Sequence, residues 1–228
     1  NFIDGGCLTF RGDSKEAIVN QGTIEVDGRD IAFIAARVHN EGELVAENGV
    51  VSSGVGMEVY FKPDSDQRIY VKKGVELPES EGKMGEGYSN EGVIRAIQSQ
   101  IAVDGNLYQL AMNLEGDMEV IGSDQLDGMI FCSAGDGRME IHGDLKGDEA
   151  HFFGKQIDVH QGQIDLSSKI GDGGLLQIGR DETGRFNEPK SQVVWVADQV
   201  EVCADGGERG SGGKVSIWGD EAAVFAGS

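Results

Sequence analysis

Residues 20–61 read NQGTIEVDGRDIAFIAARVHNEGELVAENGVVSSGVGMEVYF, and this stretch states nearly the same phrase twice. NQGTIEVD begins at Asn20 and NEGELVAE begins at Asn40, which gives a period of twenty residues. The related phrase NEGVIRA begins at Asn90, and a fainter echo, GQIDL, begins at Gly162. A fixed period of this length is typical of a solenoid, because each repeat can bury its apolar face only against its neighbours.

The residues that fill the period indicate which solenoid to expect. Short alternating runs such as Ile24-Glu25-Val26 are separated by turns rich in Gly and Asn. The leucine ladder and the ten-residue helical patterns of other repeat families are missing. We therefore predict an all-β fold, a right-handed parallel β-helix (β-solenoid) with about ten coils of roughly 20 residues.

The period also predicts which residues lie above one another, about 4.8 Å apart in adjacent coils. Three apolar pairs follow: Ile24 under Leu44, Val26 under Ala46 and Ile31 under Val51. Asn20 and Asn40 fall at equivalent turns, where stacked side-chain amides can form hydrogen bonds along the rod as a ladder.

The whole chain, residues 1–228, reads as a single β-helix segment of a longer protein, with Asn1 rather than Met at its start. Residues 62–89 interrupt the pattern with many charges and with Pro63 and Pro78. Because Pro cannot donate to an inner hydrogen-bond ladder, we predict an excursion from the rod wall there, where solenoids often carry binding function. A short helical turn at 96–101 is an alternative to a strand, since isoleucines recur there at intervals of three and four.

The composition is strongly acidic, with 40 acidic against 19 basic residues and a formal net charge of −21. Binding to nucleic acid or to an anionic membrane surface depends on Lys and Arg, so this balance argues against both partners. No apolar run reaches eighteen residues, and we expect no membrane span. One interpretation of this acidity is that it keeps a long rod soluble. A second interpretation is a scaffold that is stiffened by weakly bound calcium.

The cysteine and histidine residues predict no metal site and no cofactor. Cys7, Cys132 and Cys203 are odd in number and lack zinc-binding spacing, so they are expected to be small buried side chains rather than a disulfide framework. Three histidines, spaced nine residues apart, could stack on one face as ligands, but an odd spacing more often reverses the face of a strand. These are His142, His151 and His160.

The sequence suggests one hypothesis for a catalytic function. Fingerprints of serine hydrolases, P-loop proteins, zinc proteases and dinucleotide-binding proteins are all missing from the sequence. A polysaccharide lyase or hydrolase on a β-helix would use carboxylates from adjacent coils, and Asp27 and Glu47 are twenty residues apart. Such pairs also arise by chance among forty acidic residues, and we expect no catalytic role.

Arg11-Gly12-Asp13 is the candidate binding site that the sequence supplies. This is the integrin-recognition tripeptide, at a position where a turn between two strands is expected. Gly-Asp turns are frequent in this chain, so a plain turn is the simpler interpretation.

Four motifs, in order, resemble the passenger of two-partner secretion exoproteins, the filamentous-haemagglutinin-like adhesin family. Residues 19–24 (VNQGTI) and 38–51 (VHNEGELVAENGVV) resemble the VxNxGxIxAxxGxV coils of that family. Residues 104–113 (DGNLYQLAMN) are similar to its GGNxYxLAxN segment. Residues 176–184 (LQIGRDETG) resemble VLIGGDxxG, with departures at Gln177 and Arg180, and residues 204–227 (ADGGERGSGGKVSIWGDEAAVFAG) resemble ADAxxxGxGGxVxVWxDxxTxFxG.

The resemblance implies a secreted or surface-exposed bacterial adhesin, associated with the outer membrane, whose non-catalytic rod displays a binding surface. The implied partners are a receptor or glycan on a host or neighbouring cell, and an outer-membrane transporter that exports the chain unfolded. The scarcity of cysteine fits that route, since disulfides would obstruct a narrow pore. The family's amino-terminal secretion module, with its NPNG-type motifs, is missing from this sequence.

Overall fold

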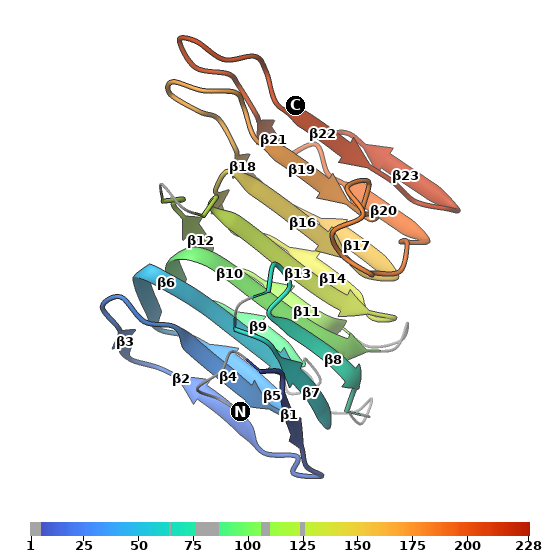
Figure 1. The fold of residues 1–228 in the computed structure, drawn as a ribbon. Coiled ribbons are helices and arrows are strands. Elements are labelled where there is room, and N and C mark those ends of the chain that lie inside the picture. Colours follow the sequence, from blue (N-terminus) through green and yellow to red (C-terminus); the bar gives the residue numbers. More distant parts are fainter. Residues whose placement is uncertain (1–5, 64, 76–86, 106–109, 124–125) are drawn as a thin grey trace.

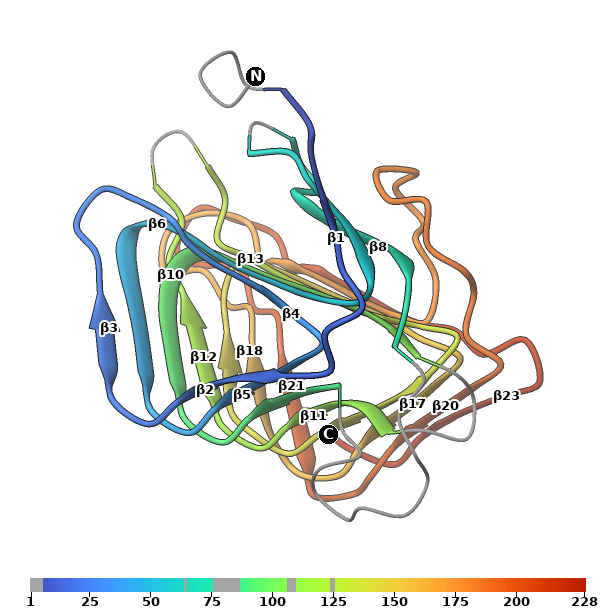
Figure 2. The same cartoon turned by 90° about the horizontal axis from the view of Figure 1, so that it is seen from below.

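The computed structural model describes residues 6–63, 65–75, 87–105, 110–123 and 126–228, and in these residues the fold is all-β with 23 strands and no helix. Two parallel sheets form a stack in which each turn of the chain adds one level, and a small antiparallel sheet packs outside it (Figure 1). Viewed along the stack, the parallel strands surround one interior, a β-helix-like arrangement (Figure 2). The predicted all-β class with stacked parallel strands is confirmed.

The 8-stranded parallel sheet takes one strand from each level. In order along the sheet these are β2 (Ala17–Asn20), β5 (Arg37–Asn40), β9 (Tyr88–Asn90), β11 (Leu110–Leu114), β14 (Arg138–Ile141), β17 (Gln156–Val159), β20 (Val193–Val196) and β23 (Ala222–Phe225).

The 12-stranded parallel sheet covers the other two sides of the interior, and two 13-residue strands bend from one of these sides to the other (Figure 2). Its strands are β3 (Thr23–Glu25), β4 (Ile31–Ala35), β6 (Glu43–Val55), β10 (Val93–Gly105), β12 (Asp117–Val120), β13 (Met129–Gly135), β15 (Leu145–Lys146), β16 (Glu149–Phe153), β18 (Gly162–Asp165), β19 (Leu175–Ile178), β21 (Val200–Cys203) and β22 (Lys214–Ile217).

The core consists of columns of apolar side chains, one from each level. The predicted pairs Ile24 with Leu44 and Ile31 with Val51 are confirmed by the register of β6 with β3 and β4. The first pair begins a continuous column of seven residues: Ile24, Leu44, Ile94, Met118, Leu145, Ile164 and Val202. Stacking at the strand spacing lets each level bury its apolar face against the next.

The predicted hydrogen bond between the side chains of Asn20 and Asn40 is present, and the ladder extends to Asn90. The Nδ2 of Asn20 donates to the Oδ1 of Asn40 at 2.8 Å, and the Nδ2 of Asn40 donates to the Oδ1 of Asn90 at 2.7 Å. Asn40 and Asn90 are fully buried, so each amide needs these partners. At the next level the register places Leu114 beside Asn90, and the column becomes apolar.

A column of glycines lies at the corner that follows the ladder. A Cβ on Gly42 would lie 2.1 Å from the backbone oxygen of Gly22, and one on Gly92 would lie 1.9 Å from that of Gly42. Gly116 and Gly143 continue the column with similar distances. The recurring Asn-x-Gly phrase therefore has a steric cause, because at this corner one level's backbone passes too close to the next for any side chain.

Several expectations need correction. The 8-stranded sheet gives eight levels rather than about ten coils of 20 residues, because some turns are lengthened by excursions: Asn40 pairs with Asn90, fifty residues on. The alternative of a helical turn at 96–101 is wrong, since these residues lie within β10.

The excursion predicted at 62–89 has different limits. The chain leaves the stack at β7 (Glu58–Phe61) and returns at β9, so Tyr88 and Ser89 belong to the parallel sheet. Strands β1 (Leu8–Arg11) and β8 (Ile69–Lys73) flank β7 in an antiparallel sheet. Residue 64 and residues 76–86, which include Pro78, lie outside the described residues.

The cysteine prediction holds for one residue of three. Cys132 is buried in the core, whereas Cys7 is exposed and Cys203 is partly exposed, and all three are free. Within the described part of the chain, no helix has the length and hydrophobicity needed to cross a bilayer.

We predict that Gly42→Ala lowers the free energy of unfolding by roughly 2–3 kcal/mol, because the added methyl group collides with the backbone of the level below. Gly22→Ala is the matched control, since a Cβ there meets nothing within 4 Å, and its effect should stay within about 0.5 kcal/mol. Urea unfolding of both variants measures the difference. Equal stability of the two variants would contradict the close stacking at this corner.

Candidate binding pocket on the outer face

Two excursions cover the outer face of the 12-stranded sheet on one side of the stack (Figure 2). The antiparallel sheet β1-β7-β8 is held by an apolar cluster in which Val59, Phe61, Ile69 and Val71 pack on Ala102 of β10. The second excursion, the segment 179–192 between β19 and β20, is held by Phe186, which packs on the outward side chains Met129, Phe131 and Phe153. Outward apolar side chains of the sheet therefore hold both excursions in place.

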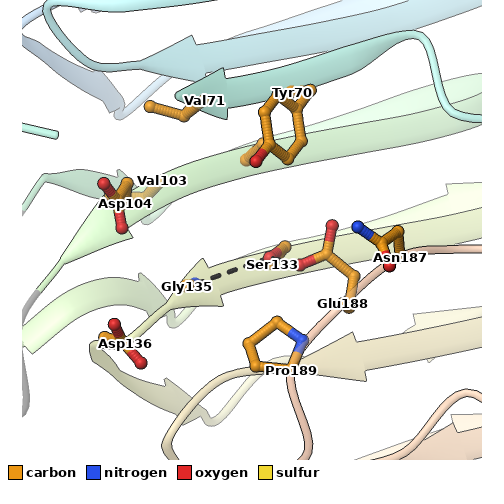
Figure 3. Close-up of a pocket in the computed structure, with 11 residues that line it drawn as sticks. Tyr70, Val71, Val103, Asp104, Ser133, Gly135, Asp136, Asn187, Glu188 and Pro189 are labelled. Carbon is orange, nitrogen blue, oxygen red and sulfur yellow. Dashed lines mark hydrogen bonds between the residues drawn. The ribbon is translucent and has the colours of Figure 1, made fainter. Parts of the chain in front are cut away.

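A cavity of about 190 Å³ lies between these two excursions. β8 contributes Tyr70 to one side, and the second excursion contributes Asn187, Glu188 and Pro189 to the other (Figure 3). The floor comes from β10 and from β13 with the turn that follows it. Its lining residues are Tyr70, Val71, Ala102, Val103, Asp104, Ser133, Gly135, Asp136, Asn187, Glu188 and Pro189.

Glu188 joins the two excursions to the sheet. Its Oε2 accepts a hydrogen bond from the Oγ of Ser133 at 2.5 Å, and its Oε1 accepts one from the Nε2 of Gln67 at 2.7 Å. Gln67 belongs to the connection between β7 and β8, 121 residues away in sequence. One carboxylate therefore fixes both walls of the cavity.

The connection that carries Gln67 is itself anchored to the stack. The Oε1 of Gln100 accepts a hydrogen bond from the backbone N–H of Arg68 at 2.7 Å, and its Nε2 donates to the carbonyl of Asp66 at 2.9 Å. The guanidinium of Arg68 forms an ion pair with Asp30 at 2.8 Å. These contacts hold the cavity wall in one position, which lowers the entropic cost of ligand binding.

Two carboxyl groups of the cavity have pKa values above their usual values. Burial raises the pKa of Glu188, against the opposing effect of its hydrogen bonds from Ser133 and Gln67. Burial also raises the pKa of Asp104, and the neighbouring charge of Asp136 acts in the same direction. The cavity is therefore unfavourable for a further anion and favourable for neutral groups that donate hydrogen bonds.

The chemistry of the lining suits a hydroxyl-rich ligand. Tyr70 is 46% exposed and presents its ring at the rim. The carboxyl groups of Asp104, Asp136 and Glu188 and the amide of Asn187 offer acceptors and donors to hydroxyl groups. An aromatic surface beside convergent polar groups is the arrangement expected of a small-molecule site.

The structure places Arg11-Gly12-Asp13 away from this cavity, and none of the three residues lines it. Arg11 is the last residue of β1, and its guanidinium forms an ion pair with Glu58 at 3.0 Å while its side chain stays 69% exposed. The N–H of Gly12 donates to the carbonyl of Met57 at 3.1 Å, and Asp13 is exposed. Recognition by this tripeptide stays a prediction.

Asp27 and Glu47, the two carboxylates considered for catalysis, are both exposed, and neither lines the cavity between the excursions. Glu188 and Ser133 were missed by the sequence analysis because residues brought together across 55 positions carry no local motif. One signal was present: Pro189 marks an irregular segment much as Pro63 marks the first excursion.

The three equally spaced histidines do not form one cluster, although two of them are in contact. His151 is buried, with Nε2 at 3.1 Å from the Oε2 of Glu149 and Nδ1 at 3.0 Å from the Oε1 of Gln177. His142 and His160 stack on each other on the 8-stranded sheet. His151 is separated from the other two because it lies on β16 of the 12-stranded sheet, whereas His142 and His160 directly follow β14 and β17 of the 8-stranded sheet.

Comparison with known proteins supports the fold. No family model matches the chain, and no curated protein matches it in sequence. Among solved structures, the crystal structure of the HMW1 secretion domain from Haemophilus influenzae is similar, with a TM-score of 0.66 and 19% sequence identity. The similarity covers 96% of this chain and 68% of that one, so nearly the whole chain has a fold similar to that structure.

We predict that Glu188→Gln gains stability over the parent protein as pH rises. Burial raises the pKa of Glu188, so its contribution to stability is complete below the unfolded-state pKa and is lost as pH rises through the folded-state pKa. Glutamine keeps the shape without the buried charge: its amide oxygen can accept from Gln67, and its amide NH2 group can donate to the Oγ of Ser133. Urea unfolding at acidic and at mildly alkaline pH measures the difference.

Glu182→Gln is the matched control with the opposite sign. Hydrogen bonds from Lys214 and Ser216 hold the pKa of Glu182 below its usual value, so the parent should be the more stable of the two above that range. Parallel pH profiles for Glu188→Gln and the parent would contradict a buried, desolvated carboxyl group at the cavity.

Proposed function

We propose that this chain is a right-handed parallel β-helix of a secreted bacterial two-partner exoprotein, and that it acts without catalysis by displaying a glycan-binding cavity on its outer face. The fold shared with a secretion domain supports the first part. The cavity between the two excursions supports the glycan-binding part, because its lining combines polar groups with an exposed aromatic residue at the rim.

Export through an outer-membrane transporter is part of this proposal. The similar structure is itself a secretion domain, and this supports a relation to two-partner secretion. It does not support the expectation that the secretion module is missing from this chain. Contacts between successive levels allow the stack to form level by level once outside the cell.

Adhesion is proposed from the location of the cavity. Both excursions lie outside the stack, where a ligand on another cell can reach them (Figure 2). The acidic lining disfavours uronic acids, sulfated sugars and sialic acids, so we infer that the ligand is a neutral or N-acetylated oligosaccharide.

The second candidate function is a carbohydrate-active enzyme. One observation favours it: Glu188 combines a raised pKa with a position beside Asp104 and Asp136, as a general acid near ionisable partners would. Asp27 and Glu47 do not line this cavity, so we do not propose them as the site of such chemistry.

We predict that the purified chain binds neutral or N-acetylated oligosaccharides on a glycan array and that Tyr70→Ala weakens this binding about tenfold, the equivalent of ~1.4 kcal/mol from lost ring contact. Phe225→Ala is the control, because Phe225 is equally exposed, at 46%, but lies on β23, away from the cavity. Equal binding by Tyr70→Ala and the parent, or no binding at all, would count against the glycan proposal.

The same assay separates the two functions. Incubation of the bound oligosaccharide with the chain should return it intact if the chain is an adhesin. Shorter products, formed by the parent and not by Glu188→Gln, would favour the enzyme.

A further inference from the structure

A cluster of two histidines and a glutamate lies on the outer face of the 8-stranded sheet, apart from the cavity. Glu140 is on β14, and His142 and His160 directly follow β14 and β17. These strands pair in parallel with Ile141 opposite Val159, so the two histidines come side by side. Their rings stack with centroids 4.5 Å apart and planes 8° apart.

Glu140 completes the cluster because residues two apart on a strand point to the same face. Its Oε2 lies 3.7 Å from the Nε2 of His142. One ligand atom from each of Glu140, His142 and His160 lies within 4.8 Å of the other two. In the part of the chain that the structure describes, this is the single cluster of three such groups.

The Nε2 of His160 is buried and has no hydrogen-bond partner among the described residues. A buried polar atom without a partner is costly, and a bound group is one of the explanations for it. Trp195 packs edge-on against the His160 ring at 5.4 Å, on the side away from His142. His160 therefore lies between Trp195 on one side and His142 on the other.

Charged neighbours hold the carboxylate in place. Arg138 forms ion pairs with Glu140 at 2.5 Å and with Asp158 at 2.8 Å, so it links the outward carboxylates of two successive levels. Such contacts around a ligand group fix its orientation. The opposite oxygen of Glu140 faces the histidines.

We propose that Glu140, His142 and His160 bind one Zn²⁺ ion, which would clamp two adjacent levels of the stack. Two imidazoles and one carboxylate form a donor set typical of zinc, with the fourth position left to water, whereas calcium requires six to eight oxygen ligands. Zinc bonds of about 2.0–2.2 Å require the donors to approach slightly, which small side-chain rotations of the partly exposed residues allow. The net charge of −21 favours uptake of a cation.

The test is isothermal titration of the metal-free chain with Zn²⁺, with Ca²⁺ titrated in parallel. We expect one Zn²⁺ per chain, no comparable Ca²⁺ binding, and a rise in Tm with Zn²⁺. His160→Ala, His142→Gln and Glu140→Gln should each weaken zinc binding at least tenfold. His39→Ala is the matched control and should bind as the parent does, since His39 lies on the same sheet but contacts Ser89 instead.

Substitution with Co²⁺ gives a second readout that does not depend on stability. A tetrahedral site with two imidazoles should give the visible absorption of tetrahedral Co²⁺ in the parent and lose it in His160→Ala. His142→Gln and Glu140→Gln change partly exposed side chains, so they keep the test informative if His160→Ala does not fold. Absence of zinc binding in the folded parent, unchanged binding in the three variants, or equally tight Ca²⁺ binding would each overturn the proposal.

Discussion

Hydrogen bonding of each level's backbone to the next is the constraint on which the rest of the structure depends. It fixes the spacing of the levels, and that spacing dictates which residues fit between them. At one corner the backbones approach so closely that only glycine is accommodated, from Gly42 to Gly143. Beside it, buried amides satisfy one another along Asn20, Asn40 and Asn90. Residues inserted between two strands of a level do not fit within this spacing. The excursions therefore lie outside the stack.

The excursions turn an otherwise uniform wall into a surface with distinct sites. On β10 and β13 the inward residues Ile101 and Cys132 belong to the core, whereas the outward residues Ala102 and Ser133 support the first excursion and Glu188. The alternation of a single strand thus serves the core and the cavity together. On another wall, the same in-register stacking brings His142 beside His160. Stacking therefore builds functional groups from residues that are distant in sequence.

The sequence was informative where its signal repeats. The phrases at Asn20, Asn40 and Asn90 were sufficient to predict the parallel stack, the pair Ile24 with Leu44, and the amide ladder. The number of levels could not be predicted from the sequence, because an excursion lengthens a turn by a number of residues that does not follow the repeat period. The cavity was not predictable either, since contacts such as Gln67 with Glu188 join segments 121 residues apart that share no pattern.

The most direct test of the account is disulfide cross-linking across the first excursion. Val45 and Arg95 are paired neighbours on β6 and β10, within reach of a disulfide if the levels stack as described. In a chain with Cys7 and Cys203 replaced by serine, the pair Val45→Cys and Arg95→Cys should cross-link rapidly under mild oxidation. The pair Glu47→Cys and Arg95→Cys, two positions out of register, should remain reduced. Equal cross-linking of the two pairs, or none in the first, would contradict a stack that resumes its register after the excursion.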